Sequence, residues 1–86
     1  MNGHRYAAYR RVIAALEIGN LLPVEREIAR DAAQGMLLSR TIDSPEVPRV
    51  ALDMSLVLRD AVVDRRLHVA VAEEVKHLME ECGPLA

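Results

Sequence analysis

The stretch from Arg49 to Glu81 contains no glycine and no proline, and its apolar residues recur at alternating intervals of four and three. This spacing places one side chain on the same face of a helix at every turn. The positions on that face are Val50, Met54, Val57, Ala61, Asp64, His68, Val71, Val75, Leu78 and Cys82. The pattern predicts helical structure across the stretch, with Asp64 and His68 as polar positions in an otherwise apolar seam.

Two interpretations of this stretch remain open. The chain either turns near Asp64, which gives helices over about residues 47–64 and 66–82, or continues as one helix of about 50 Å. In a continuous helix, Asp64 and His68 would form a polar layer and pair with each other or across a dimer, because an unpaired buried charge is costly. After a turn, Asp64 would cap a new helix and His68 would be exposed on its first turn.

The first half of the chain predicts two more helices. Apolar residues at helical spacing predict a helix over about residues 4–19, and Gly19-Asn20 suits its end. Pro23 suits the first turn of a second helix, over about residues 24–40. Its apolar stripe would include Val24, Ile28, Ala32, either Gly35 or Met36, and either Leu38 or Ser39. We therefore expect an all-α fold, a small bundle of three or four helices forming a single domain over residues 1–86.

Two residues of the second helix carry specific expectations. If Ile28 is fully buried in this stripe, its replacement by alanine should cost about 2–5 kcal/mol. Gly35, like Ala32, is small and would let another backbone approach closely.

The composition favours self-association. The chain has 86 residues, no Phe, no Trp and a single cysteine, Cys82, so its core is small, aliphatic and without an internal disulfide. The third helix is apolar nearly all round and cannot turn every such side chain toward one thin domain. We therefore expect a homodimer that also holds a protein partner not identified by the sequence. The expected interface residues are Met54, Val57, Ala61, Asp64, His68, Val71 and Val75.

Other classes of function have little support in the sequence. No nucleophile elbow or glycine-rich phosphate loop is present, so we expect neither an enzyme nor a cofactor. Glu73, Glu74 and His77 have ligand-like spacing, but we expect an ion-paired exposed helix face unless a dimer completes a metal site. No run of about 18 uncharged apolar residues could span a membrane. Together with the lone cysteine, this predicts a cytoplasmic protein.

An alternative function comes from a family resemblance. Residues 22–29, Leu-Pro-Val-Glu-Arg-Glu-Ile-Ala, resemble the stretch that opens the helix-turn-helix of GntR-type bacterial repressors. Ser39-Arg40-Thr41 is similar to the start of their recognition helix. The resemblance implies a DNA-binding regulator. However, Asp43-Ser44-Pro45 falls where that helix would run, and the net charge of −2 is unfavourable for meeting phosphates. We therefore expect no nucleic-acid partner.

Overall fold

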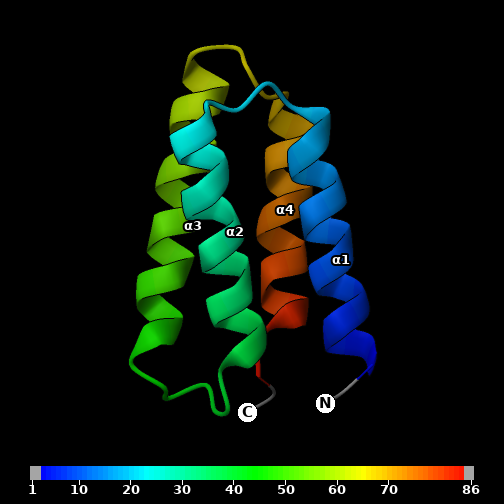
Figure 1. Cartoon of the computed structure of the whole chain (residues 1–86), viewed down its shortest axis with the longest axis vertical. Helices are drawn as coiled ribbons and strands as arrows, with labels where there is room; N and C mark the ends of the chain where they lie inside the picture. Colours follow the sequence, from blue (N-terminus) through cyan, green and yellow to red (C-terminus); the bar gives the residue numbers. More distant parts are fainter. Residues whose placement is uncertain (1–2, 85–86) are drawn as a thin grey trace.

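Four helices account for most of residues 3–84, the part of the chain described by this computed structural model (Figure 1). They are α1 (Gly3–Ile18), α2 (Pro23–Leu38), α3 (Glu46–Val63) and α4 (Val69–Cys82). Consecutive helices run in opposite directions, and the most extensive contacts are those of α2 with α3 and of α1 with α4. The predicted all-α bundle is confirmed, with helix bounds within three residues of those expected.

The chain turns after α3, so the two-helix interpretation is correct and the polar layer is wrong. Asp64 follows the last residue of α3, and Arg65 has a φ of 59°, in the left-handed region. His68, rather than Asp64, caps α4, because its Nδ1 accepts a hydrogen bond from the Ala70 N–H at 3.0 Å. Asp64 and His68 are both exposed. The turn lets Leu67 become buried between them, at 4% exposure.

The core confirms the predicted register of the second half. The inward-facing positions of α3 and α4 are each at most 6% exposed: Val50, Met54, Val57, Ala61, Val75, Leu78 and Cys82. Gly35 also meets its expectation, because a Cβ atom on it would lie 2.8 Å from Cγ1 of Val50. The absence of that atom lets α2 and α3 pack closely along their length.

The predicted stripe of α2 is wrong at its N-terminal end. Val24 is 58% exposed and Ile28 is 40% exposed. Ala32 is buried as expected, and of the two alternatives Gly35 and Met36 it is Met36 that is buried. The other buried residues of the helix are Glu25, Ala29, Ala33 and Leu37. The helix is rotated relative to the expectation because the Glu25 carboxylate faces inward, toward polar partners. The cost of about 2–5 kcal/mol expected for a buried Ile28 therefore does not apply.

Arg5 joins three helices at the end of the bundle where the described chain begins and ends. Its Nη2 lies 3.1, 2.8 and 2.9 Å from the carbonyl oxygens of Met36, Leu37 and Ser39. Its Nε donates to the Cys82 carbonyl at 3.0 Å. The last carbonyls of a helix have no partner within the helix and carry partial negative charge. One guanidinium group of α1 thus provides hydrogen-bond donors for carbonyl groups at the C-terminal ends of both α2 and α4.

Replacing Arg5 with alanine should therefore lower the free energy of unfolding by about 2–3 kcal/mol, since charge-assisted hydrogen bonds are lost at once. Arg5→Lys should recover little of this loss, because an ammonium lacks the planar fork of the guanidinium. Urea unfolding measures both. The control is Arg10→Ala, which removes an exposed arginine of the same helix and should change stability by less than about 0.5 kcal/mol. An equal loss in both variants would contradict this role of Arg5.

The opposite end of the bundle is held by a contact between its two loops. The Asn20 N–H donates to the Arg66 carbonyl at 2.8 Å. The Arg66 guanidinium forms a two-pronged ion pair with the Glu25 carboxylate, and it also lies 3.0 Å from Asp64 Oδ2. Glu25 Oε1 accepts a further hydrogen bond from the Leu22 N–H at 2.9 Å, which caps α2. These hydrogen bonds, those from Arg66 above all, hold the pKa of the Glu25 carboxyl below its ordinary value.

This lowered pKa makes stability depend on pH in a defined direction. The ion pair of Glu25 stabilises the fold fully above its ordinary pKa of 4.5. The contribution is lost as the pH falls from there through the lower pKa of the folded state. Glu25→Gln should lower stability at pH 7 and flatten the loss below pH 4.5, as measured by urea unfolding across pH. The control, Glu27→Gln, alters an exposed neighbour and should leave the slope unchanged. A Glu25→Gln variant with the wild-type slope would contradict the assignment.

Candidate functional site

The side of α3 that faces away from the core carries a second regular pattern. Leu52, Leu56, Arg59 and Val63 follow one another at intervals of four, three and four, and we call them the outer stripe. Leu52 is 58% exposed, Leu56 39% and Val63 74%. Alternating intervals of this kind, filled mainly by apolar residues, are typical of a surface that packs against another helix.

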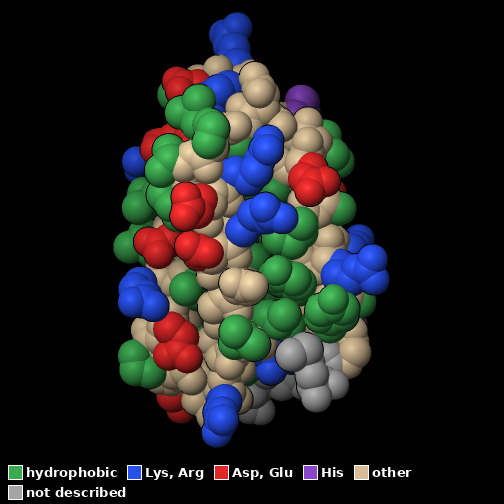
Figure 2. Space-filling view, viewed as in Figure 1, with side chains coloured by type: hydrophobic (Ala, Val, Ile, Leu, Met, Phe, Trp, Pro, Cys, Tyr) green, Lys and Arg blue, Asp and Glu red, His purple; other side chains and the backbone are tan. Residues whose placement is uncertain are grey.

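The outer stripe is exposed because α3 is apolar on two opposite faces. Its inner positions fill the core, and no element of residues 3–84 covers the other face. Figure 2 shows hydrophobic side chains along the edge of the molecule that α3 forms in Figure 1, with acidic side chains between them. Exposed apolar side chains arranged in a row, rather than scattered singly, indicate a docking surface.

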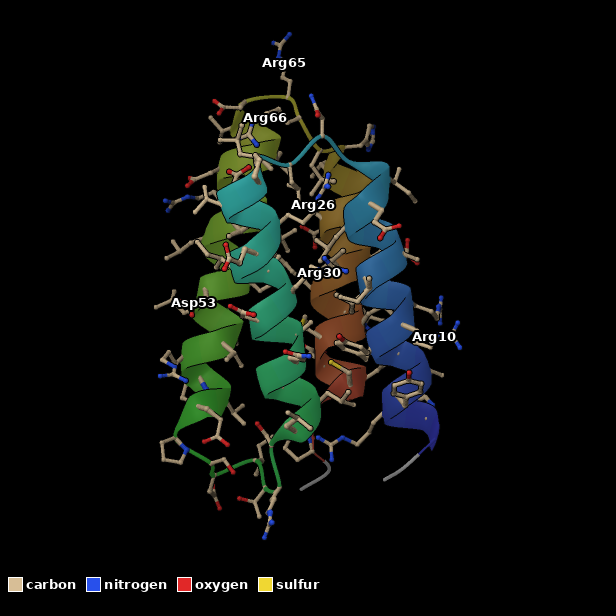
Figure 3. All side chains as sticks on the ribbon, viewed as in Figure 1. Arg10, Arg26, Arg30, Asp53, Arg65 and Arg66 are labelled. Atoms are coloured by element: carbon tan, nitrogen blue, oxygen red, sulfur yellow. The ribbon has the colours of Figure 1, made fainter. Side chains whose placement is uncertain are left out.

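Charged residues lie beside the outer stripe, on the side of α3 toward α2. Arg49 and Asp53 line a shallow hollow there with Asp31 of α2, and Figure 3 labels Asp53 on α3. Asp60 Oδ1 lies 3.6 Å from Nη2 of Arg59. Arg59 itself is well exposed, with 68% of its side chain accessible. Three of the four residues of the outer stripe are therefore apolar and the fourth, Arg59, is cationic. The carboxylates of Asp53 and Asp60 lie nearby.

The residues predicted to form the interface do not lie together on the surface. Met54, Val57, Ala61 and Val75 are core residues of the single chain. Val71 is partly buried against that core, whereas Asp64 and His68 lie in the exposed turn between α3 and α4. The sequence shows that α3 is apolar nearly all round, but the expected interface residues belong to its inner register alone. The signal for the outer stripe was a second spacing of four and three, offset from the first by two residues.

A hollow between α1 and α2 has a volume of about 470 Å³. Arg26 and Arg30 line it together with the acidic Glu27 and Asp31, so its charges are mixed. Figure 3 shows Arg26 and Arg30 projecting from α2 on the side of α1. Arg10 projects from the side of α1 that faces away from α2, and Arg65 projects from the loop between α3 and α4. Arg26 and Arg30 thus lie apart from both Arg10 and Arg65.

The segment that resembles a GntR-type helix-turn-helix adopts a different arrangement. Residues 23–38 form one continuous helix, and Ser39-Arg40-Thr41 lie in the loop that follows. The next helix begins only at Glu46 and runs antiparallel to α2. A recognition helix beginning at Thr41 is therefore not formed, and the geometry gives DNA binding no support.

The residues with ligand-like spacing on α4 pair with cations or face solvent. Glu73 Oε1 lies 3.9 Å from Lys76 Nζ, and Glu74 Oε1 lies 3.7 Å from Arg11 Nη2. His77 is exposed. Within residues 3–84, no three His, Cys, Asp or Glu side chains converge in a way that could hold a metal ion.

Two further findings concern the reactivity of the cysteine and the apolar character of the helices. Cys82 is fully buried, donates a hydrogen bond to the Met79 carbonyl at 3.4 Å, and has its thiol pKa raised by burial to about 11. The thiol is therefore unreactive at neutral pH while the protein is folded. None of the helices in the described range has both the length and the apolar character needed to cross a membrane.

Comparison with known proteins gives no family for this chain: no family model, no curated protein and no solved structure matches it significantly.

Proposed function

We propose that this protein is a protein–protein interaction module that acts by self-association through the outer stripe of α3. The observation that carries the proposal is the row of exposed Leu52, Leu56 and Val63 on a helix whose opposite face is already buried. Fully burying an exposed Leu or Val side chain contributes about 1.5–3 kcal/mol, and these three side chains still have between 39% and 74% of their surface to bury. A twofold interface counts each of these residues twice, so the stripe offers a substantial driving force.

The rest of the described chain is compatible with this function. The core is complete within one chain, with no unpaired side-chain nitrogen or oxygen atom buried in residues 3–84. A folded monomer can therefore present the outer stripe as a preformed surface, which lowers the ordering cost of association. Any further partner protein would meet a rigid helical surface rather than a segment that folds on binding.

Sedimentation velocity at micromolar concentration tests the proposal. The wild-type protein should sediment as a dimer, and Leu56→Glu should be monomeric because it places a carboxylate in the centre of the apolar row. Leu38→Glu is the matched control: it introduces the same change at a leucine of α2 that is 65% exposed and lies outside the stripe. It should remain dimeric.

Two results would refute this function. One is a wild-type protein that stays monomeric at every concentration. The other is a Leu56→Glu variant that folds normally, as judged by circular dichroism, and still dimerises as tightly as the wild type.

A further inference from the structure

We infer that the hollow between α1 and α2 binds a small molecule that carries one oxyanion, a carboxylate or a phosphate, on an aromatic ring. The guanidinium groups of Arg26 and Arg30 would hold the oxyanion, and Tyr9 on the opposite wall would contact the ring. The hollow contains no residue of the outer stripe, so this inference is independent of the proposed self-association.

The two arginines are placed to act on one group. They are one helical turn apart, or about 6 Å along the axis of α2, and both side chains project toward α1 (Figure 3). Both line the hollow, and neither side chain forms an ion pair or a hydrogen bond within residues 3–84. Arg5 and Arg66, by contrast, are already held by carbonyl groups and carboxylates. Two neighbouring guanidinium groups with free donors suit the oxygen atoms of a carboxylate or a phosphate.

The aromatic residues of the chain lie on the α1 side of this region rather than in the core. Tyr6 and Tyr9 are the only two; Tyr6 is 47% exposed and Tyr9 is half-buried. Tyr9 lines the hollow, and its ring stacks on that of Tyr6 with the ring centroids 6.1 Å apart. Figure 2 shows hydrophobic side chains beside basic ones on the face that α1 and α2 form. An aromatic ring bound here would contact Tyr9 and lie within reach of guanidinium groups, which also stack on aromatic faces.

Two carboxylates at the edge of the hollow restrict the charge of the ligand. Glu27 and Asp31 each follow an arginine by one residue and lie about 100° further around α2, and Asp31 also lines the hollow between α2 and α3. A polyanion such as a nucleic acid strand would meet these carboxylates as well as the arginines. A molecule with a single oxyanion avoids them. The volume of about 470 Å³ is in the range of about 300–1,000 Å³ that is typical of small-molecule sites.

NMR titration of the ¹³C,¹⁵N-labelled protein with phenyl phosphate and with benzoate tests the inference. We expect saturable shifts in the Nε–Hε signals of Arg26 and Arg30 and in the ring signals of Tyr9. Inorganic phosphate and phenol each carry only one of the two features, and each should bind at least about tenfold more weakly than phenyl phosphate. The tighter of phenyl phosphate and benzoate identifies the preferred oxyanion.

Variants of the hollow separate a built site from general charge attraction. Arg26→Gln and Arg30→Gln each remove one charge at an exposed position, so neither should disturb the fold, and each should weaken binding by about tenfold. Arg10→Gln is the matched control, because it removes an exposed arginine on the side of α1 that faces away from α2. It should leave binding unchanged. Glu27→Gln should tighten binding, since it removes a carboxylate close to the bound oxyanion.

Several results would overturn the inference. These are the absence of saturable shifts with both phenyl phosphate and benzoate, shifts centred on another part of the protein, and equal weakening in Arg10→Gln and Arg30→Gln. Inorganic phosphate that binds as tightly as phenyl phosphate would also overturn it, because the aromatic ring would then have no role. Saturable binding that requires both Arg26 and Arg30, and is unchanged in Arg10→Gln, supports the site.

Discussion

The arrangement of the helices depends most on the hydrogen bonds between the Arg5 guanidinium and the carbonyl groups at the ends of α2 and α4. Helix ends leave carbonyl groups without partners, and in a small bundle several ends lie close together. Here the ends of α2 and α4 meet beside the first turn of α1, and Arg5 donates to both. The contact brings together residues from the start, the middle and the end of the described chain. It therefore fixes how α1 sits against two helices that touch each other only lightly.

Polar contacts at both ends compensate for a core that offers little shape specificity. Alanines occupy many of the buried positions of α1 and α2, and no Phe or Trp is present to lock neighbouring layers together. Small aliphatic side chains allow close approach, as at Gly35 and Val50, but they tolerate sliding of one helix along another. Arg5 at one end and the pair of Glu25 with Arg66 at the other oppose such sliding, because a small axial shift would break their hydrogen bonds.

The inner register of α3 and α4 could be predicted because regular spacing of apolar residues reports directly on burial. The rotation of α2 could not, since Glu25 reads as a solvent-facing carboxylate until Arg66, distant in sequence, is placed beside it. The role of Arg5 could not be predicted either. In the sequence it is one of several basic residues near the start of the chain, and its hydrogen-bond partners are backbone carbonyl groups, which no sequence pattern identifies. The turn at Asp64 contains no glycine or proline, and Arg65 adopts a left-handed φ that its residue type does not announce. The candidate site could be predicted only in part. The sequence indicates that α3 has more apolar residues than one core can bury, but two overlapping spacings of four and three do not show which face of α3 remains exposed.

The pairing of α1 with α4 has a consequence for the order in which the chain can fold. α2 and α3 are joined by a short loop over residues 39–45 and can associate soon after both are synthesised. The partner of α1 is the last helix, and the hydrogen bond from Arg5 to Cys82 spans 77 residues of chain. Closing so distant a contact is slow relative to forming a local hairpin. During synthesis, the part of the apolar face of α1 that packs on α4 therefore stays uncovered until α4 has emerged, which prolongs its exposure to chaperones and to misassociation.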